Sequence, residues 1–415
     1  MSESGCGLCP CVYRSARGVL TPNGLLGTAL FVLLVSSAAH AQWGPDVKLS
    51  TNEGAAGLNE NMGQCVVASG DAVHVVWADF KNKGQAIYYK RSTDKGETWG
   101  PDTRISGTPG ADTFPLLAQS GSTLHLVFLR NSGTPQSASY YKRSTDGGNT
   151  WGPDVLLGNT KWWPGVAAAG SMVYVSLNTV SAEDAPNSVV YFRRSTDKGA
   201  TWEPQQRISK AERRAGGRSE DPAIMASGKY VHLVWNDNRD VPPGKGMAVY
   251  YRSSPDMGVT WNPEAALTHA PDATYFPSIY PAGSDVEVVY GDRGAGPFDI
   301  YHLHSADFGA TWGAKEQITK TPTVEFYPAV VRDGSNVHMV WAGKDEGIMY
   351  LHSGNGGVRW DPVVCLTTRG LSPFIAVAGD AVHVIFVSQR DGHGAIYYMR
   401  NPTGNKSGPV VPQAP

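Results

Sequence analysis

The sequence has little charge and little cysteine for its length. Charged residues make up 17% of the 415 residues, and 35 basic against 37 acidic residues leave a formal net charge of −2. This balance argues against nucleic acid as a partner and against binding to an anionic membrane surface, because both select basic chains. No apolar run after residue 41 is long enough to span a membrane. No nucleotide-binding loop, Ser-His-Asp elbow or zinc motif occurs, so the sequence predicts neither a cofactor nor a metal.

The first 41 residues have the pattern of a secretory signal. Arg14 and Arg17 supply a positive flank, Leu25–Val35 is an apolar run, and Ala39-His40-Ala41 fits an A-x-A cleavage site. We therefore expect residues 1–41 to be a signal peptide that is cleaved after Ala41, and the mature protein to be secreted or periplasmic.

The sequence is rich in turn formers, with 48 Gly and 28 Pro, which is typical of many short strands joined by tight turns. One eight-residue segment recurs along it. It is first found as Ser92-Thr93-Asp94-Lys95-Gly96-Glu97-Thr98-Trp99, then at residues 144–151, 195–202, 254–261 and 305–312, with a degenerate copy at 353–360. The closing tryptophans follow one another at spacings of 52, 51, 59, 51 and 48 residues, which marks a supersecondary unit stacked many times.

The chemistry of this segment is local. Its aspartate accepts hydrogen bonds from turn N–H groups, its glycine takes a positive φ that other residues resist, and its tryptophan can pack against a neighbouring sheet. Because the same residues return in copy after copy, a structural role as a hairpin staple is favoured over a catalytic one.

Four strand-like runs surround each segment, and their alternation of apolar residues predicts antiparallel meanders. Counting the first runs gives seven units, six of which carry a proline near the start: Pro115, Pro164, Pro222, Pro277, Pro328 and Pro373. The last unit has only three runs, and residues 43–50 match the fourth run of the first unit.

We therefore predict an all-β fold, a seven-bladed β-propeller of four-stranded antiparallel blades. It spans residues 42–401 as one domain, its ring is closed by the N-terminal strand 43–50 completing the last blade, and a disordered tail follows at 402–415. On this map Cys65 and Cys365 stand on different blades, so we expect two free, buried thiols.

The recurring pattern S-x-D-x-G-x-T-W resembles the Asp-box, or BNR repeat, of bacterial and animal sialidases and their relatives. The resemblance covers nearly the whole chain after residue 41 and implies an Asp-box propeller. It says less about activity, because Asp-box propellers also include xyloglucanase-type glycosidases, sortilin-type receptors and assembly factors. In the family the Asp-boxes lie on the face opposite the active site. This implies a site at the mouth of the central channel, in the loops that enter the first strands and join the second strands to the third.

Those loops hold the candidate substrate-binding residues. Trp163, Tyr275 and Phe276 precede first strands and could stack on sugar rings, or they could fill the channel and wedge the blades. In sialidases three arginines hold the substrate carboxylate, a task that suits the guanidinium fork. Here Arg130, Arg239 and Arg293 could do so, and the alternative is that they form local Asp–Arg braces.

The resemblance also implies catalytic roles, because sialidases use a tyrosine nucleophile, an activating glutamate and an aspartate as acid/base. By position, Tyr327 resembles the nucleophile, Glu220 the activating glutamate, and Asp112 or Asp79 the acid/base. The F/Y-R-I-P motif of the family, which carries an arginine, is absent, and Asn61-Met62-Gly63-Gln64 stands in its place.

Several histidines share one position in the second strands: His74, His125, His232, His338 and His383. Tyr174 and Glu287 stand there in the other two units. Equivalent positions on different blades are spread around the ring, so packing between blades is favoured over metal binding.

Three functions remain open. The first is a secreted, sialidase-like glycoside hydrolase acting on a terminal or acidic sugar. The second is a non-catalytic propeller that binds a glycan or a protein. The third is a polysaccharide lyase in which Tyr275 or Tyr327 acts as the base near Arg239 or Arg293. In each case the expected partner is carbohydrate or a protein ligand at the channel mouth, and we expect the protein to be a monomer.

Overall fold

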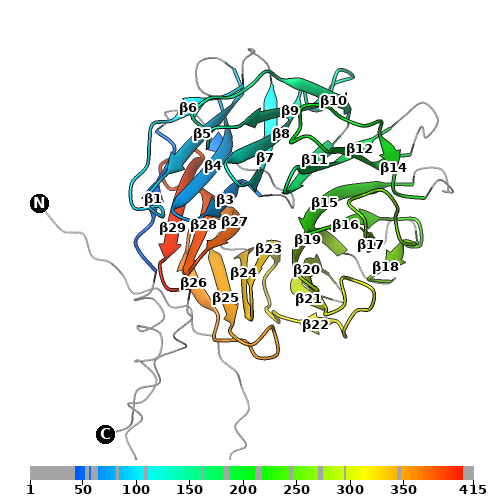
Figure 1. Cartoon of the computed structure of the whole chain (residues 1–415). Helices are drawn as coiled ribbons and strands as arrows, with labels where there is room; N and C mark the ends of the chain where they lie inside the picture. Colours follow the sequence, from blue (N-terminus) through cyan, green and yellow to red (C-terminus); the bar gives the residue numbers. More distant parts are fainter. Residues whose placement is uncertain are drawn as a thin grey trace, which may run out of the picture.

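The computed structural model describes residues 43–51, 56–57, 64–80, 84–106, 111–160, 162–180, 187–210, 217–242, 246–269, 274–293, 296–343 and 347–404. The predicted signal peptide, Asn61-Met62-Gly63 and the tail beyond residue 404 lie outside these ranges. In the described ranges the strands form seven antiparallel sheets arranged as a ring around a central axis (Figure 1). This confirms the all-β, seven-bladed propeller. None of the described segments forms a helix that could cross a membrane.

Each blade runs from an inner strand beside the axis to an outer strand at the rim. Blade 1 contains β2 (Ala56–Gly57), β3 (Val66–Ser69), β4 (Ala72–Asp79), β5 (Ala86–Ser92) and β6 (Thr103–Arg104). Blade 2 contains β7 (Asp112–Ser120), β8 (Thr123–Arg130), β9 (Ala138–Ser144) and β10 (Val155–Asn159). Blade 3 contains β11 (Trp162–Ala169), β12 (Met172–Thr179), β13 (Val189–Ser195) and β14 (Gln206–Arg207). Blade 4 contains β15 (Ser219–Ser227), β16 (Tyr230–Asp237), β17 (Ala248–Ser254) and β18 (Ala265–Ala266).

The remaining three blades repeat this order. Blade 5 contains β19 (Thr274–Ala282), β20 (Asp285–Asp292), β21 (Asp299–Ser305) and β22 (Glu316–Gln317). Blade 6 contains β23 (Glu325–Asp333), β24 (Asn336–Gly343), β25 (Ile348–Ser353) and β26 (Val364–Thr367). Blade 7 contains β27 (Leu371–Ala378), β28 (Ala381–Ser388), β29 (Ala395–Asn401) and β1 (Val47–Lys48). Blade 1 departs from the pattern because its inner strand is in two pieces, β2 and β3, which both pair with β4.

The N-terminal strand closes the ring, as predicted. Val47 of β1 pairs with Tyr398 of β29, and the two strands lie side by side in Figure 1. Beyond this short ladder, the Gly44 N–H donates to the Arg400 carbonyl at 2.9 Å and the Leu49 N–H donates to the Ile396 carbonyl at 2.8 Å. The edge of β29, which would otherwise be open, is thus covered by β1.

The second strand of each blade is buried on both faces. In β8, the residues Thr123 to Leu129 are all buried, and β12 is buried throughout. Because a blade packs against one neighbour on each face, a near-continuous apolar strand is stable here where a surface strand would alternate. The hydrophobic core therefore runs around the ring between blades.

Each Asp-box forms the predicted staple between the third and fourth strands. In the first copy, Ser92 Oγ accepts a hydrogen bond from the Gly96 N–H at 2.8 Å, and Asp94 accepts from the Thr98 N–H at 2.9 Å. The same bonds recur in blades 2 to 5, and in blade 6 Asn355 replaces the aspartate and accepts from the Arg359 N–H at 2.8 Å. The hydrogen bonds from Ser92 and Thr98 lower the pKa of Asp94 to about 2, so it stays ionised.

A ring of seven tryptophan contacts joins successive blades. The closing tryptophan of each Asp-box meets a ring on the third strand of the preceding blade edge-on, at centroid distances of 4.8–5.5 Å. The pairs are Trp99–Tyr398, Trp151–Tyr89, Trp202–Tyr141, Trp261–Phe192, Trp312–Tyr251, Trp360–His302 and Trp43–Tyr350. Trp43 precedes β1 and supplies the contact for blade 7, which has no Asp-box. Such edge-to-face pairs contribute about 0.5–1.5 kcal/mol each beyond their buried area.

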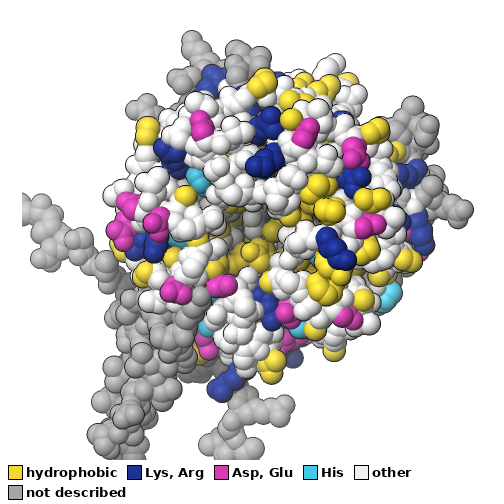
Figure 2. Space-filling model, in the orientation of Figure 1, with side chains coloured by type: hydrophobic (Ala, Val, Ile, Leu, Met, Phe, Trp, Pro, Cys, Tyr) yellow, Lys and Arg dark blue, Asp and Glu magenta, His cyan; other side chains and the backbone are white. Residues whose placement is uncertain are grey.

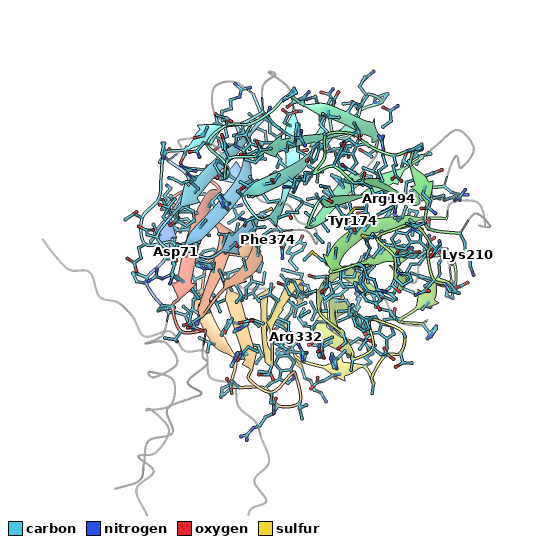
Figure 3. The ribbon with its side chains drawn as sticks, viewed as in Figure 1. Asp71, Tyr174, Arg194, Lys210, Arg332 and Phe374 are labelled. Atoms are coloured by element: carbon cyan, nitrogen blue, oxygen red, sulfur yellow. The ribbon has the colours of Figure 1, made fainter. Side chains whose placement is uncertain are left out.

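The second-strand histidines bind tyrosines within their own blades. His74, His125, His232, His338 and His383 each bring Nδ1 within 2.7–2.8 Å of a third-strand tyrosine hydroxyl. Blade 3 places Tyr174 against Phe192 at this position instead (Figure 3). In blade 5, Glu287 lies 2.6 Å from His302 and also forms an ion pair with Arg332 of blade 6. The second-strand histidines therefore contact the same third-strand rings that the tryptophans of the next blade pack against.

The two described cysteines do not form a disulfide with each other, as predicted. Cys65 is fully buried and donates to the Pro115 carbonyl at 3.2 Å, which links blades 1 and 2. Cys365 lies on the outer strand β26 and is partly exposed, so the expectation that both thiols are buried was wrong for Cys365. Outer strands are short and their side chains face solvent at the rim of the ring.

Candidate functional site

The predicted site residues and the Asp-boxes lie at opposite ends of the blades. Glu220, near the start of the inner strand β15, pairs with Asn236, near the end of β16. The first Asp-box instead meets the turn between the first two strands, because the Lys95 N–H donates to the Asp71 carbonyl at 2.8 Å. The end of the ring where inner strands begin is therefore free of Asp-boxes, as the family resemblance implied. We call this end the mouth.

The inner strands enter the ring through a bulge just before the proline. In β15 the pairing register shifts between Glu220 and Ala223, and β7, β11, β19, β23 and β27 shift at the same place. The residue before the proline has a positive φ in five of these strands: Phe114 (52°), Asp221 (56°), Phe276 (57°), Tyr327 (55°) and Ser372 (49°). A positive φ at a residue other than glycine costs about 1–3 kcal/mol and is concentrated at functional sites. Bulges likewise re-aim side chains beside such sites.

Aromatic side chains from these bulges pack in pairs across neighbouring blades. Phe114 of blade 2 meets Trp163 of blade 3 edge-on at 5.6 Å between centroids, and Phe276 of blade 5 lies 4.6 Å from Tyr327 of blade 6. Tyr275 lies 6.0 Å from Phe276. All five are partly exposed. We call this set of five residues the aromatic collar. The aromatic collar therefore has both of the roles that the sequence left open. It packs between neighbouring blades, and it presents ring surface at the mouth.

Arg130 and Asp112 meet each other. Arg130 Nε donates to Asp112 Oδ1 at 2.6 Å, and Arg130 Nη2 donates to Asp154 Oδ2 at 2.8 Å. The guanidinium also covers the Tyr140 ring, 4.3 Å from its centroid. The hydrogen bond to Asp112 raises the pKa of Arg130, against the opposing effect of burial. Asp112 is fully buried, so both groups brace blade 2.

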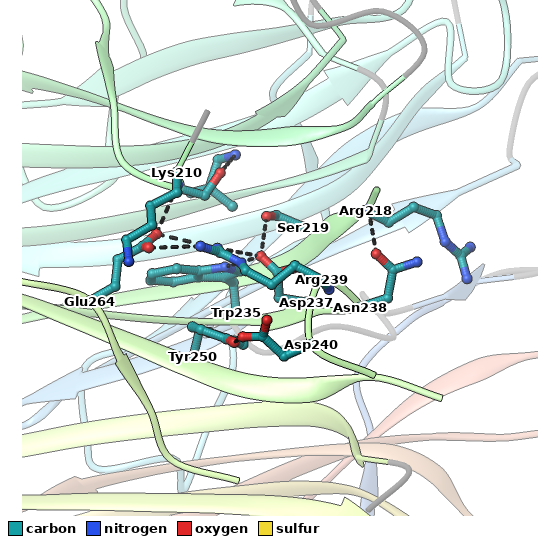
Figure 4. Close-up of polar contacts among 12 residues, drawn as sticks. Lys210, Arg218, Ser219, Trp235, Asp237, Asn238, Arg239, Asp240, Tyr250 and Glu264 are labelled. Carbon is teal, nitrogen blue, oxygen red and sulfur yellow. Dashed lines mark hydrogen bonds and ion pairs between the residues drawn. The ribbon is translucent and has the colours of Figure 1, made fainter. Parts of the chain in front are cut away.

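Arg239 occupies a second brace, in blade 4 (Figure 4). Its Nη2 donates to Asp237 at 2.6 Å and its Nη1 donates to Glu264 at 2.7 Å, while the guanidinium covers the Tyr250 ring at 4.4 Å. Burial opposes ionisation, but the two carboxylates raise the pKa of Arg239 above its usual value. Glu264 precedes the outer strand, so this guanidinium points along the blade toward the rim. Arg130 and Arg239 are therefore held by carboxylates of their own blades.

The remaining predicted residues, Asp79, Glu220 and Arg293, differ in how far they are buried. Asp79 is fully buried and accepts from Trp77 Nε1 at 3.0 Å, inside blade 1. Glu220 is partly exposed at the mouth, with one oxygen 3.6 Å from Arg218 Nη1. Arg293 is exposed and directly follows β20, whose last residue, Asp292, pairs with Thr274 beside Tyr275. The three arginines thus stand on blades 2, 4 and 5, and only Arg293 faces solvent at the mouth. The individual roles of these residues stay predictions.

Sequence reasoning missed Glu325, the first residue of β23. It is 4% exposed, and its Oε2 has no hydrogen-bond partner in the described structure. Burial raises the pKa of Glu325 to about 7, and the nearby Asp299 carboxylate adds to the effect. The sequence of blade 6 contains a signal for this residue. An aspartate stands two residues after Trp77 and Trp235 in blades 1 and 4, and Gly343 takes its place in blade 6. Glu325 is paired in register with Gly343, so it brings a carboxyl group next to the position where blades 1 and 4 have that aspartate.

The match to a known family agrees with this architecture. Residues 172–373 match the model of the BNR repeat-like domain. The match covers the recurring segments of blades 3 to 6, and the protein is a seven-bladed β-propeller. No curated protein matches the chain by sequence.

Solved structures with the same architecture are distant in sequence. An ulvan lyase of a polysaccharide lyase family, bound to a saccharide of glucuronic acid and sulfated rhamnose, is similar with a TM-score of 0.57 and 14% identity, over 85% of this chain and 95% of that chain. The polysaccharide lyase Uly1 is similar with a TM-score of 0.59 and 11% identity, over 87% and 99%. A protein of unknown function from Dyadobacter fermentans has a TM-score of 0.50 and 16% identity, over 86% and 97%. At these identities the likeness establishes the fold alone.

Proposed function

We propose that the protein is an exported propeller that binds carbohydrate at its mouth, over the aromatic collar. The observation that carries this proposal is the bulge at one end of the inner strands, where the positive-φ residues Phe114, Phe276 and Tyr327 hold aromatic rings partly exposed at the mouth of the channel. Rigid rings of this kind offer flat apolar surface to the C–H faces of sugars, and neighbouring polar groups can bind hydroxyls. Glu220, Tyr327 and Arg293 supply such groups at the same end.

For catalysis, we propose polysaccharide lyase chemistry on an acidic chain. Tyr275 and Arg293 support it because they lie on adjacent strands of blade 5, and Arg293 is not held by the ion pairs that engage Arg130 and Arg239. In this reaction Arg293 pairs with the uronate carboxylate, and Tyr275, acting as a phenolate, takes the proton from the ring carbon that bears the carboxylate. The bond from the next carbon to the glycosidic oxygen breaks and a carbon–carbon double bond forms. The leaving oxygen takes up the proton that the Tyr275 hydroxyl group now carries, which restores the phenolate.

The hydrolase alternative needs a tyrosine nucleophile activated by a glutamate. Its candidates, Tyr327 and Glu220, stand on blades 6 and 4, with blade 5 between them. Tyr327 packs against Phe276 of blade 5. This alternative predicts new reducing ends without an unsaturated product, so one assay separates the two reactions.

The test is incubation with polyuronates and neutral glycans, followed by near-ultraviolet absorbance and by reducing-end analysis. Lyase activity should be lost in Tyr275→Phe, which keeps the ring and removes the hydroxyl group, and in Arg293→Gln. Arg359→Gln, on the Asp-box face, is the matched control and should behave as the wild type. Reducing ends without absorbance, abolished by Tyr327→Phe, would replace the lyase by the hydrolase.

Carbohydrate binding has its own test. Phe276→Ala should weaken retention in affinity electrophoresis through immobilised polysaccharide, because it removes ring surface from the collar. Retention of neither wild type nor variant by any glycan would refute carbohydrate binding at the mouth. Retention without turnover would leave the non-catalytic function standing. Export predicts that the protein recovered from the periplasm or medium begins at Gln42, which N-terminal sequencing checks.

A further inference from the structure

The central channel contains a cavity that lies away from the mouth. Its volume is about 270 Å³, and side chains from all seven blades line it. The lining comes from the later residues of the inner strands, such as Ala68 of β3, Ala168 of β11 and Val377 of β27. These residues lead into the turns beside the Asp-boxes. The cavity therefore lies on the Asp-box half of the channel, and we call it the cup.

The cup is narrow on the side that faces the collar. Gln64 and Met225 line both the cup and a much smaller void of about 20 Å³, which Phe374 and Ile375 also line. Phe374 lies near the centre of the ring in Figure 3, and Figure 2 shows hydrophobic side chains around the hollow at its middle. A void this small holds a water molecule but no larger ligand. A ligand in the cup and a ligand on the collar are thus bound independently.

The wall of the cup is neutral and uneven. Blades 3 and 7 contribute only small apolar side chains, whereas blades 4 and 5 contribute Met225 and Tyr280. The residues that line the cup include no charged side chain, and their polar groups are amides and hydroxyls, such as Gln64, Gln119 and Tyr280. An ion would bring its desolvation cost with no opposite charge in this wall to offset it.

Two polar groups of the wall are placed to bind a hydroxylated ligand. Gln119 Nε2 donates to the Gly121 carbonyl at 3.0 Å, while its buried Oε1 has no partner in the described structure and can accept from a ligand hydroxyl once the amide turns toward the cup. Burial raises the pKa of Tyr280, so its hydroxyl stays protonated and can donate. A buried acceptor without a donor is unfavourable, and a bound hydroxyl would satisfy it.

We propose that the cup is a second binding site, for a neutral monosaccharide. The volume of about 270 Å³ equals roughly nine water molecules, which is at the lower limit for ligand pockets and excludes an oligosaccharide. A pyranose of about 12 heavy atoms with the binding efficiency of ordinary ligands has a dissociation constant of about 1–10 mM. This proposal stands apart from the function of the mouth, because the lining residues are different.

The experiment is saturation-transfer NMR of the whole protein with glucose, galactose and mannose, and with glucuronate as the charged comparison. The neutral sugars should give a signal that Ala168→Leu weakens, whereas any signal from glucuronate comes from the mouth and should be unchanged in Ala168→Leu. Ala168→Leu, which fills part of the cup from a partly exposed position, should weaken binding more than tenfold. Gln119→Leu keeps the side-chain size but removes the acceptor, and should weaken binding about fivefold.

Two controls keep the sites distinct. Ala200→Leu, on the exposed surface of an Asp-box, should change nothing, and thermal melting of each variant verifies that it is folded. Phe276→Ala removes ring surface from the mouth and should leave the cup signal intact. Absence of any signal at about 50 mM sugar would overturn the proposal. So would a signal that survives Ala168→Leu and disappears in Phe276→Ala, because the sugar would then lie in the mouth.

Discussion

The glycine of the Asp-box is where the repeat meets the preceding blade, so replacing it tests how the ring is held together. At Gly148 the backbone has a φ of 87°, and a Cβ built there would lie 1.9 Å from the Tyr89 hydroxyl of blade 1. Gly121 also has a positive φ, 58°, but a Cβ there would meet no atom within 4 Å. Gly121→Ala therefore measures the backbone cost alone, and Gly148→Ala measures the same cost plus the contact between blades.

The expected magnitudes differ clearly. A left-handed conformation costs an alanine about 1–2 kcal/mol, which both variants incur. Forcing extra volume into a packed contact costs about 1–3 kcal/mol more, and only Gly148→Ala incurs it, because Tyr89 is buried against Trp151 and His74. Gly121→Ala should thus lower the free energy of unfolding by about 1–2 kcal/mol and Gly148→Ala by about 2–5 kcal/mol.

Urea unfolding followed by tryptophan fluorescence measures both changes, with the m-value checked for two-state behaviour. Adding Tyr89→Phe to Gly148→Ala removes the atom that lies closest, and should recover part of the loss. Equal destabilisation by the two alanines would refute the idea that the glycine is required by the neighbouring blade. It would leave backbone conformation as the only reason for glycine in the repeat.

Two further predictions concern the same interfaces. Burial, assisted at three of the sites by nearby basic residues, lowers the pKa of His74, His125, His232 and His383 to about 4 from 6.5 in the unfolded chain. Their stabilisation is complete above pH 6.5 and is lost as the pH falls toward 4, so His125→Asn should flatten the pH dependence of urea unfolding by up to about 1.4 kcal/mol per pH unit. The exposed His269→Asn is the control, and a curve for His125→Asn that runs parallel to the wild type would contradict the assignment. In blade 6, Asn355→Asp with Arg359→Thr restores the Asp-box and should add about 1 kcal/mol to the free energy of unfolding. Thermal melting of the double variant that shows no gain over Asn355→Asp alone would mean that the threonine hydroxyl contributes nothing there.

The propeller could be predicted from the sequence because its information is local and repeated. The spacing of the tryptophans from Trp99 to Trp360 sets the blade count, and the likeness of residues 43–50 to the fourth strand of blade 1 reveals the closure. The repeat placed the histidines at equivalent positions around the ring, but the sequence did not predict their partners, which are third-strand tyrosines of the same blade. Cys365 was misjudged because strand order does not tell how much of an outer strand is covered.

The candidate site was harder, because its residues come from different blades and their partners are not encoded in the repeat. Arg130 and Arg239 have the residue type that binds carboxylates, and the sequence does not tell that Asp112, Asp154 and Glu264 already bind them. The positive φ of Tyr327 and Phe276 has no sequence signal beyond the proline that follows, since the residue before a proline usually takes an extended conformation. Glu325 became visible only when its burial and the missing aspartate at Gly343 were seen together.

The closure of blade 7 by the N-terminal strand sets the order in which the protein can be completed during synthesis. The Ile396 N–H donates to Ser50 Oγ across 346 residues of sequence. The ring of Trp43 likewise packs on Tyr350 of blade 6, so both contacts join the N-terminal segment to the last-made part of the chain. At about 5–20 residues per second, roughly 20–70 s separate the synthesis of these two ends. During that time β1 has no partner, because β29 of blade 7 has not yet been made. Blades 1 to 6 can meanwhile form one after another. A nascent chain halted before residue 395 would be a nearly complete arc with two open edges, which is the state most exposed to pairing with another copy of itself.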